Sequence, residues 1–172
     1  MAIIPETKDW TWVLERPCPE CGFEAGLQTP TSTAATLPGV IERWEAVLRR
    51  ADLTVRPDDA TWSPLEYACH VRDVFSVMDT RLHTMLTRDE PTFANWDQDA
   101  TAVDYDYAHQ VPQQVSDQLT IAGGRIGERF GAVPPEDWER FGHRSDGATF
   151  TVRSLSGYFL HDVVHHLHDV QG

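Results

Sequence analysis

The stretch SPLEYACH at residues 63–70 decides the fold of this chain, because it marks the start of a long helix. Ser63 and Glu66 have the spacing of a capping box, in which the serine caps a free backbone N–H and the glutamate reaches back. Pro64 suits the first helical position. Apolar residues then recur every three or four positions from Tyr67 onward, which is typical of one helix face. The pattern predicts an amphipathic helix over 63–87.

Three further segments show the same periodicity. They predict helices near residues 35–50, 112–130 and 152–170. In the first segment we expect Pro38 to fall in the first turn, where a proline is tolerated. Residues 148–152 suit a short extended stretch, but no convincing pair of strands competes with the helices. The sequence therefore predicts an all-α four-helix bundle.

Glycines interrupt the third predicted helix. Gly123, Gly124 and Gly127 each weaken it by about 1 kcal/mol relative to alanine, so we expect them to serve close packing. The connection before this helix, residues 88–110, is long enough to cross the bundle. Such a crossing leaves the second and third helices parallel, and the second and fourth antiparallel.

Composition limits the classes of function. The chain has 172 residues, with 14 basic against 27 acidic residues and a net charge of −13, which disfavours binding to nucleic acid. No apolar run is long enough for a membrane span, and the N-terminus lacks the pattern of a secretory leader. Three cysteines do not suggest a secreted disulfide framework. We expect a cytoplasmic protein that acts on a small molecule, with no nucleic-acid or membrane partner.

Histidines provide the candidate metal site. His161 and His165 are four residues apart, so their rings share a helix face, and His70 borders the apolar stripe of the second helix. If these two helices are antiparallel, a rise of about 1.5 Å per residue brings all three rings to one level. We therefore predict that His70, His161 and His165 bind one divalent ion, with Zn²⁺ or Ni²⁺ most suitable. The alternative is that they are ordinary histidines hydrogen-bonded to backbone or solvent.

A site with three imidazole ligands leaves a coordination position open, which is typical of catalytic sites. His166 is expected to face solvent, and His168 is an alternative ligand nearer the helix end. Carboxylates that could orient the ligand rings are Glu66, Asp73, Asp97, Asp99 and Asp162.

The cysteines allow several interpretations. Cys18 and Cys21 in the segment CPECG form half of a four-sulfur zinc site, and no second CxxC follows. They could be a redox pair, ligands shared with histidine, or inert thiols. Cys69 is expected to be a small core residue rather than a nucleophile.

Two motifs carry a resemblance to a known family. With WSPLEYACH at 62–70 and YFLHDVVHH at 158–166, the chain resembles the DinB-like superfamily, also called the YfiT-like metal-dependent hydrolases. The resemblance covers residues 30–170 and places the family's three ligands at His70, His161 and His165. It implies an up-down-down-up bundle over 31–172, preceded by an extension over 1–30 that packs on it, and it implies frequent homodimers.

Characterised members of this family include S-transferases and isomerases that use low-molecular-weight thiols such as mycothiol or bacillithiol. The resemblance therefore implies a metal-dependent transferase that activates such a thiol. Metal-dependent hydrolysis, and a non-catalytic metal-binding module of a stress response, are the alternatives. Polar loop residues expected near the mouth of the site are Asn95, Trp96, Asp97, Gln98, Arg144, Ser145 and Asp146.

Overall fold

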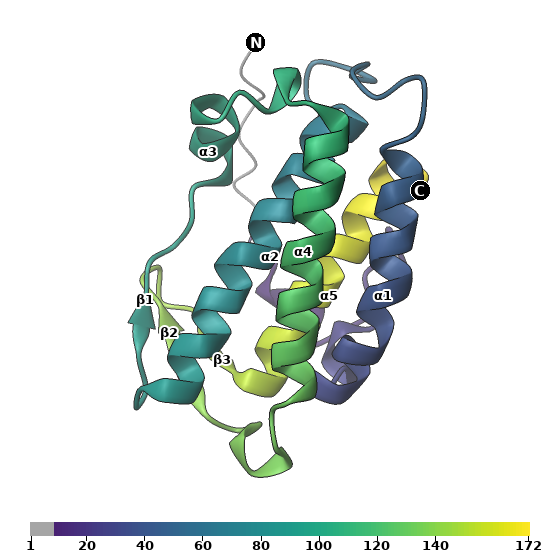
Figure 1. Cartoon of the computed structure of the whole chain (residues 1–172). Coiled ribbons are helices and arrows are strands. Elements are labelled where there is room, and N and C mark those ends of the chain that lie inside the picture. Colours follow the sequence, from purple (N-terminus) through teal and green to yellow (C-terminus); the bar gives the residue numbers. More distant parts are fainter. Residues whose placement is uncertain (1–8) are drawn as a thin grey trace.

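The computed structural model describes residues 9–172, and four long helices form its body. They are α1 (Pro30–Val47), α2 (Pro64–Thr87), α4 (Pro112–Gly131) and α5 (Val152–Asp169). Figure 1 shows that α1 and α5 run one way and that α2 and α4 run the other, so α2 is antiparallel to α5. The predicted four-helix bundle with up-down-down-up order is confirmed.

The first helix differs from its prediction. It begins at Pro30 rather than near residue 35, because Thr29 forms a capping box with Ser32. Pro38 therefore lies inside the helix, and its expected place in the first turn was wrong. Its side chain is exposed, so the ring meets solvent, and the helix continues through a position that lacks one backbone N–H donor.

The second helix begins as its sequence predicts. Ser63 accepts a hydrogen bond from the Glu66 N–H at 3.3 Å, and the Glu66 carboxylate accepts one from the Ser63 N–H at 2.9 Å. Arg56 donates to the same carboxylate from the preceding loop. This cap fixes the first turns of α2, which carry His70.

The core lies between the helices and is largely aromatic and aliphatic. Trp44 of α1 is fully buried, and its indole N–H donates to the Val163 carbonyl of α5 at 3.3 Å. Phe75 of α2 and Phe159 of α5 meet edge to face at 5.7 Å between ring centroids. Phe159 also stacks on Phe130 of α4. These contacts join all four helices around one core.

A small sheet, which the sequence did not predict, closes one side of the bundle. Strands β1 (Thr92–Phe93), β2 (Phe141–Arg144) and β3 (Thr149–Thr151) are arranged in that order. β1 pairs with β2 in parallel, and β2 pairs with β3 in an antiparallel hairpin. The connection after α2 continues through α3 (Gln98–Asp104) and η3 (Tyr107–His109) to α4. Of the expected extended stretch 148–152, residues 149–151 form β3.

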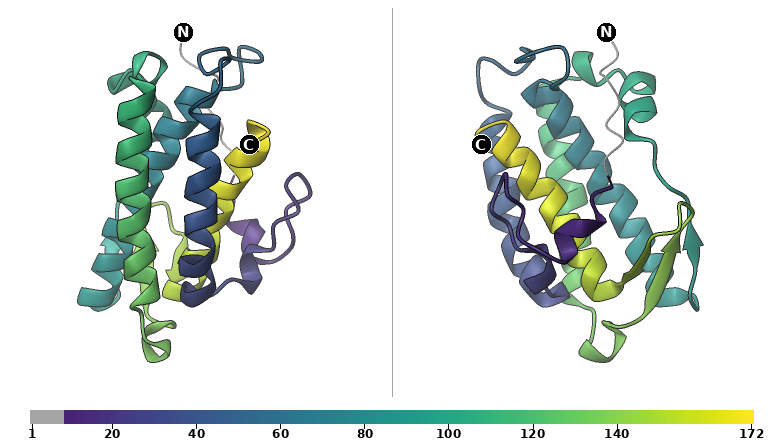
Figure 2. Two further views of the ribbon diagram at one scale, coloured as in Figure 1. Left: turned by 45° about the vertical axis from the view of Figure 1, so that its right-hand side comes forward. Right: turned by 180° about the vertical axis from the view of Figure 1, so that it is seen from behind.

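The segment before α1 lies against α5, as Figure 2 shows in the view from behind. It contains two short 3₁₀ helices, η1 (Thr11–Leu14) and η2 (Ala25–Leu27). A Cβ atom at Gly157 of α5 would collide with the Ala25 carbonyl oxygen, so the two backbones touch where only glycine fits. Val13 is fully buried. The segment is thus packed onto the bundle.

Within residues 9–172, none of the helices combines the length and apolarity that crossing a membrane requires.

Candidate metal centres

Helix α5 presents two neighbouring pairs of polar residues, each with a spacing of four. His161 and His165 form one pair, and Asp162 and His166 form the other, turned by about 100° around the helix. The two pairs join different partners in space. His161 and His165 lie with Cys18 and Cys21, whereas Asp162 and His166 lie with His70. In each group the potential ligand atoms lie within 4.8 Å of one another.

One of these groups, which we call the His70 group, consists of His70, Asp162 and His166. The His70 Nε2 atom lies 3.3 Å from Asp162 Oδ1, and His166 Nε2 lies 3.4 Å from the same oxygen. The His70 ring is fully buried between Trp62 and Trp96, with Trp96 stacked almost parallel to it at 5.4 Å. This packing leaves the His70 ring little freedom to turn.

The protonation states of His70 and Asp162 suit the binding of a cation. Burial lowers the pKa of His70, so its imidazole is neutral at pH 7 and can offer a lone pair. Burial alone would raise the pKa of Asp162, but the hydrogen bond with His70 and the charges of the neighbouring imidazoles lower it well below its ordinary value. Two imidazoles and an ionised carboxylate are a donor set that suits Zn²⁺ and other divalent transition metals. The His70 group therefore fits a divalent metal ion by the chemistry of its donor atoms.

The other group, which we call the Cys–His group, consists of Cys18, Cys21, His161 and His165. Cys18 Sγ lies 3.7 Å from His165 Nδ1. Cys18 is 1% exposed and His161 is 4% exposed, and His161 Nε2 has no hydrogen-bond partner among residues 9–172. Burial lowers the pKa of His161 to about 4 and raises the pKa of the Cys21 thiol to about 11. Burial also lowers the pKa of His165.

A cavity of about 840 Å³ adjoins the His70 group. Asp162 forms part of its wall, so one member of the His70 group faces the cavity directly. The opposite parts of the wall come from the N-terminal segment, α2, the loop before α3, and the hairpin. The wall includes Trp10, Arg81, Trp96, Arg144, Tyr158 and Asp162.

Two arginines lie in the cavity wall, which also contains five aspartates. Arg81 is 6% exposed, and its guanidinium donates to the Ala94 carbonyl at 3.0 Å, with no carboxylate in salt-bridge range among the described residues. Burial and the charge of Arg144 both lower the pKa of Arg81. Arg144 pairs with Asp146 and donates to the Tyr158 hydroxyl at 3.2 Å. Arg81 is thus a buried cation without an ion-pair partner among residues 9–172, although Asp146 and Asp162 act on it from a longer distance.

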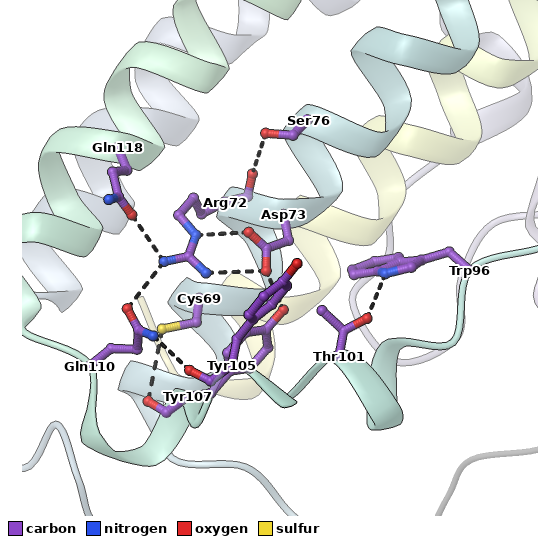
Figure 3. Close-up of polar contacts among 10 residues, drawn as sticks. All are labelled: Cys69, Arg72, Asp73, Ser76, Trp96, Thr101, Tyr105, Tyr107, Gln110 and Gln118. Carbon is purple, nitrogen blue, oxygen red and sulfur yellow. Dashed lines mark hydrogen bonds and ion pairs between the residues drawn. The ribbon is translucent and has the colours of Figure 1, made fainter. Parts of the chain in front are cut away.

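Side-chain contacts fix the crossing connection that carries Trp96, as Figure 3 shows. The Trp96 indole N–H donates to Thr101 Oγ1 at 2.8 Å. The Tyr107 hydroxyl donates to Asp73 of α2, and Arg72 holds the same carboxylate at 2.8 Å. The connection is therefore attached to α2 on both sides of α3, and Trp96 is held against the His70 ring.

The structure separates the three ligands predicted from the sequence. His161 and His165 lie together, whereas His70 belongs to the other group. His166 does not face solvent as expected. Instead it is largely buried and pairs with Asp162 and Asp169, because the neighbouring side of α5 also faces protein.

Asp162 and His166 belong to the His70 group, although neither was predicted from the sequence to be a ligand. Asp162 was expected only to orient a ligand ring, and the spacing Asp162–His166 was the signal that could have identified it. Of the loop residues expected at the mouth, all but Ser145 line the cavity, and the Ser145 hydroxyl accepts a hydrogen bond from the Asn95 N–H instead. Cys69 is fully buried in the core, as expected.

Comparison with known proteins agrees with this architecture. The family model described as the DinB superfamily matches residues 47–170. A search of curated proteins finds no significant match. Among solved structures, YfiT from Bacillus subtilis is similar, with a TM-score of 0.69 and 16% sequence identity, covering 99% of this chain and 91% of YfiT. YfiT is described as a probable metal-dependent hydrolase with an unusual four-helix bundle topology.

Proposed function

Because the chain belongs to the DinB superfamily and its His70 group adjoins a large cavity, we propose that it is a metal-dependent hydrolase of small anionic substrates. The observation that carries this proposal is the convergence of His70, Asp162 and His166 beside the cavity wall. Three protein ligands, one of them exposed to the cavity, are the arrangement of catalytic rather than structural metal sites. The description of YfiT as a probable metal-dependent hydrolase supports the same class.

A divalent cation held by these residues supplies Lewis-acid activation of water or of a substrate carbonyl. The chain provides the surroundings. Trp96 covers the His70 ring and shields it from solvent. Asp162 balances part of the charge of a bound cation at the edge of the cavity. Burial favours a neutral His70 as a ligand, and it outweighs the Asp162 carboxylate, which by itself raises the pKa of His70.

Arg81 and Arg144 support an anionic substrate. A buried guanidinium without a carboxylate partner costs several kcal/mol unless it gains one. A carboxylate or phosphate group in the cavity would provide that partner, and an arginine fork matches either group with two parallel hydrogen bonds. We therefore expect Arg81 to bind the anionic group of the substrate while the reacting bond lies towards Asp162.

The size of the cavity supports a second candidate function. A volume of about 840 Å³ is at the upper end for a small-molecule site, so two molecules could lie side by side. A transferase that uses a low-molecular-weight thiol, which the family resemblance implies, needs such room. It would use the same His70 group and the same arginines, and it differs in requiring the added thiol.

The test uses purified chain without a histidine tag, freed of metal and reloaded with Zn²⁺ or Ni²⁺. Hydrolysis of small carboxylate and phosphate esters is followed with and without glutathione, mycothiol or bacillithiol. We expect His70→Ala to lower kcat/KM by more than about 100-fold, because a ligand is lost. His109→Ala is the control, since that ring lies on the surface and belongs to neither group. Turnover that survives His70→Ala would overturn the proposal, and turnover only with an added thiol would favour the transferase.

A second variant tests the substrate class. Arg81→Gln should raise KM for anionic esters and leave neutral esters of similar shape almost unchanged. An equal effect on both kinds of ester would mean that Arg81 supports the structure only.

A further inference from the structure

We propose that the Cys–His group is a second metal centre, a closed structural Zn²⁺ site that fastens the N-terminal segment to α5. Its four ligands are Cys18 and Cys21 from the segment and His161 and His165 from the helix. It is separate from the His70 group and uses the other pair of α5. A complete set of four protein ligands is the mark of a structural zinc site.

The geometry agrees with tetrahedral zinc. Bond lengths of about 2.3 Å to sulfur and about 2.0 Å to nitrogen place neighbouring ligand atoms roughly 3.3–3.8 Å apart. The distance from Cys18 Sγ to His165 Nδ1 is 3.7 Å, and all four ligand atoms lie within 4.8 Å of one another. A shift of at most about 1.5 Å per pair would therefore complete the site.

An unpartnered ring nitrogen points to the same ligand. His161 is 4% exposed, and its Nε2 atom has no hydrogen-bond partner among the described residues. A buried polar atom without a hydrogen bond destabilises the folded chain. Cys18 and Cys21 beside it offer only weak hydrogen bonding as thiols. A bound cation satisfies the ring nitrogen and both sulfur atoms at once.

The backbone around the cysteines forms a turn that suits a metal. The Gly22 N–H donates to the Cys18 carbonyl at 2.8 Å, and the Cys18 N–H donates to the Phe23 carbonyl at 3.0 Å. Gly22 has φ +72°, which favours glycine. The turn therefore keeps both sulfurs on the side that faces α5.

Carboxylates outside the group orient His165. Its Nε2 atom lies 3.4 Å from Glu20 and 3.7 Å from Asp169. A proton on Nε2 shared with these carboxylates leaves the lone pair on Nδ1, the atom that faces Cys18. The tautomer that binds a cation is thus the one that the surroundings favour.

The proposed site has a consequence for the cavity. Asp9, Trp10 and Thr11 form part of the cavity wall and belong to the segment that the ion would hold. Trp10 packs on His165 at 5.0 Å and on His161 at 5.6 Å between ring centroids. Zinc at the Cys–His group therefore fixes the position of this wall, and the ion takes no part in the reaction itself.

Cobalt titration tests the site without an activity assay. Thiolate ligands give Co²⁺ an intense near-ultraviolet charge-transfer band, which the His70 group cannot produce because it has no sulfur. We expect the metal-free chain to bind two equivalents of Co²⁺ and to show this band. The double variant Cys18→Ser, Cys21→Ser should lose the band and one equivalent. His70→Ala should keep the band, and so should Cys69→Ala, the matched control for a cysteine outside the group.

A measurement on the unmodified chain makes the test independent of whether the variants fold. Zn²⁺ should slow alkylation of Cys18 and Cys21 several-fold, and a chelator should restore the faster rate. Equal alkylation with and without Zn²⁺, absence of the thiolate band, or a Cys18–Cys21 disulfide in freshly purified protein would each overturn the proposal. Because none of these results depends on turnover, they do not depend on the proposed hydrolase function.

Discussion

Two adjacent glycines of α4 provide a direct test of how the bundle packs. A Cβ atom at Gly123 would lie 2.7 Å from Ile41 Cδ1 and 2.8 Å from Phe75 Cε2. At Gly124 the same atom would meet nothing within 4 Å. Ile41 can move its terminal methyl group, but the Phe75 ring is fully buried and held against Phe159. We therefore expect Gly123→Ala to strain the core and Gly124→Ala to leave it undisturbed.

The magnitude follows from two opposing contributions. Alanine in place of glycine stabilises a helix interior by about 1 kcal/mol, and this gain is common to both variants. Overpacking at Gly123 costs about 1–3 kcal/mol. Gly124→Ala should thus stabilise the chain, and the two variants should differ by about 1–3 kcal/mol. At 2–4 °C per kcal/mol for a chain of this size, Gly123→Ala should melt roughly 2–12 °C below Gly124→Ala.

The assay is thermal unfolding followed by circular dichroism, with both variants in the same metal-free buffer. Comparing neighbouring positions of one helix removes the effect of helix propensity from the difference. If Gly123→Ala melts at or above Gly124→Ala, then α4 does not pack against Ile41 and Phe75 as described, and the packing argument fails.

Three further predictions follow from other parts of the structure. Burial alone would raise the pKa of Glu66, but Arg56 and Ser63 lower it below 4.5. Glu66→Gln should therefore lower the free energy of unfolding, measured in urea at pH 7, by about 1.5–3 kcal/mol. This cost should shrink as the pH falls below 4.5 through the lowered pKa, and a cost that grows on acidification would contradict it. Pro38→Ala should stabilise the chain by roughly 1–2 kcal/mol, since it restores a helix-interior N–H at an exposed position; a lower melting temperature would contradict the gain. Removing bound metal with a chelator should lower the melting temperature, because an ion at a hundredfold excess over Kd stabilises the folded chain by about 2.7 kcal/mol per site. An unchanged melting curve after confirmed removal would argue against both metal centres.

Local signals explain why the helices were predictable. Capping and apolar periodicity act over a few residues, so the segment 63–70 and the stripe that follows it predict α2 without knowledge of the rest of the chain. The same signals failed at the start of α1, where the cap uses Thr29 and Ser32 and lies ahead of a stretch with little apolar periodicity. The sheet was also missed, because β1 has only two residues and pairs with a strand far away in the sequence.

The division of the ligands between two groups depends on rotation about α5, which spacing alone does not determine. A spacing of four residues places His161 and His165 on one face of the helix, and it equally places Asp162 and His166 on one face. Which pair meets His70 depends on how α5 is turned in the bundle, and core contacts such as the one between Trp44 and the Val163 carbonyl influence that turn. The positions of the histidines along their helices predict the level of each ring along the bundle axis. They do not determine the rotation of α5 about its own axis.

The two groups are physically linked because they share turns of α5. His161 and Asp162 are consecutive, as are His165 and His166, so the two groups occupy the same two turns of α5. A cation in the Cys–His group would restrain these turns from the side of the N-terminal segment, while Trp96 restrains His70 from the opposite connection. Sites built on such rigid elements hold their ligands in place before substrate arrives. The part of the cavity wall formed by Trp10 and Asp162 would therefore keep a fixed shape, because Trp10 packs on His161 and His165 of α5 and Asp162 belongs to the same helix.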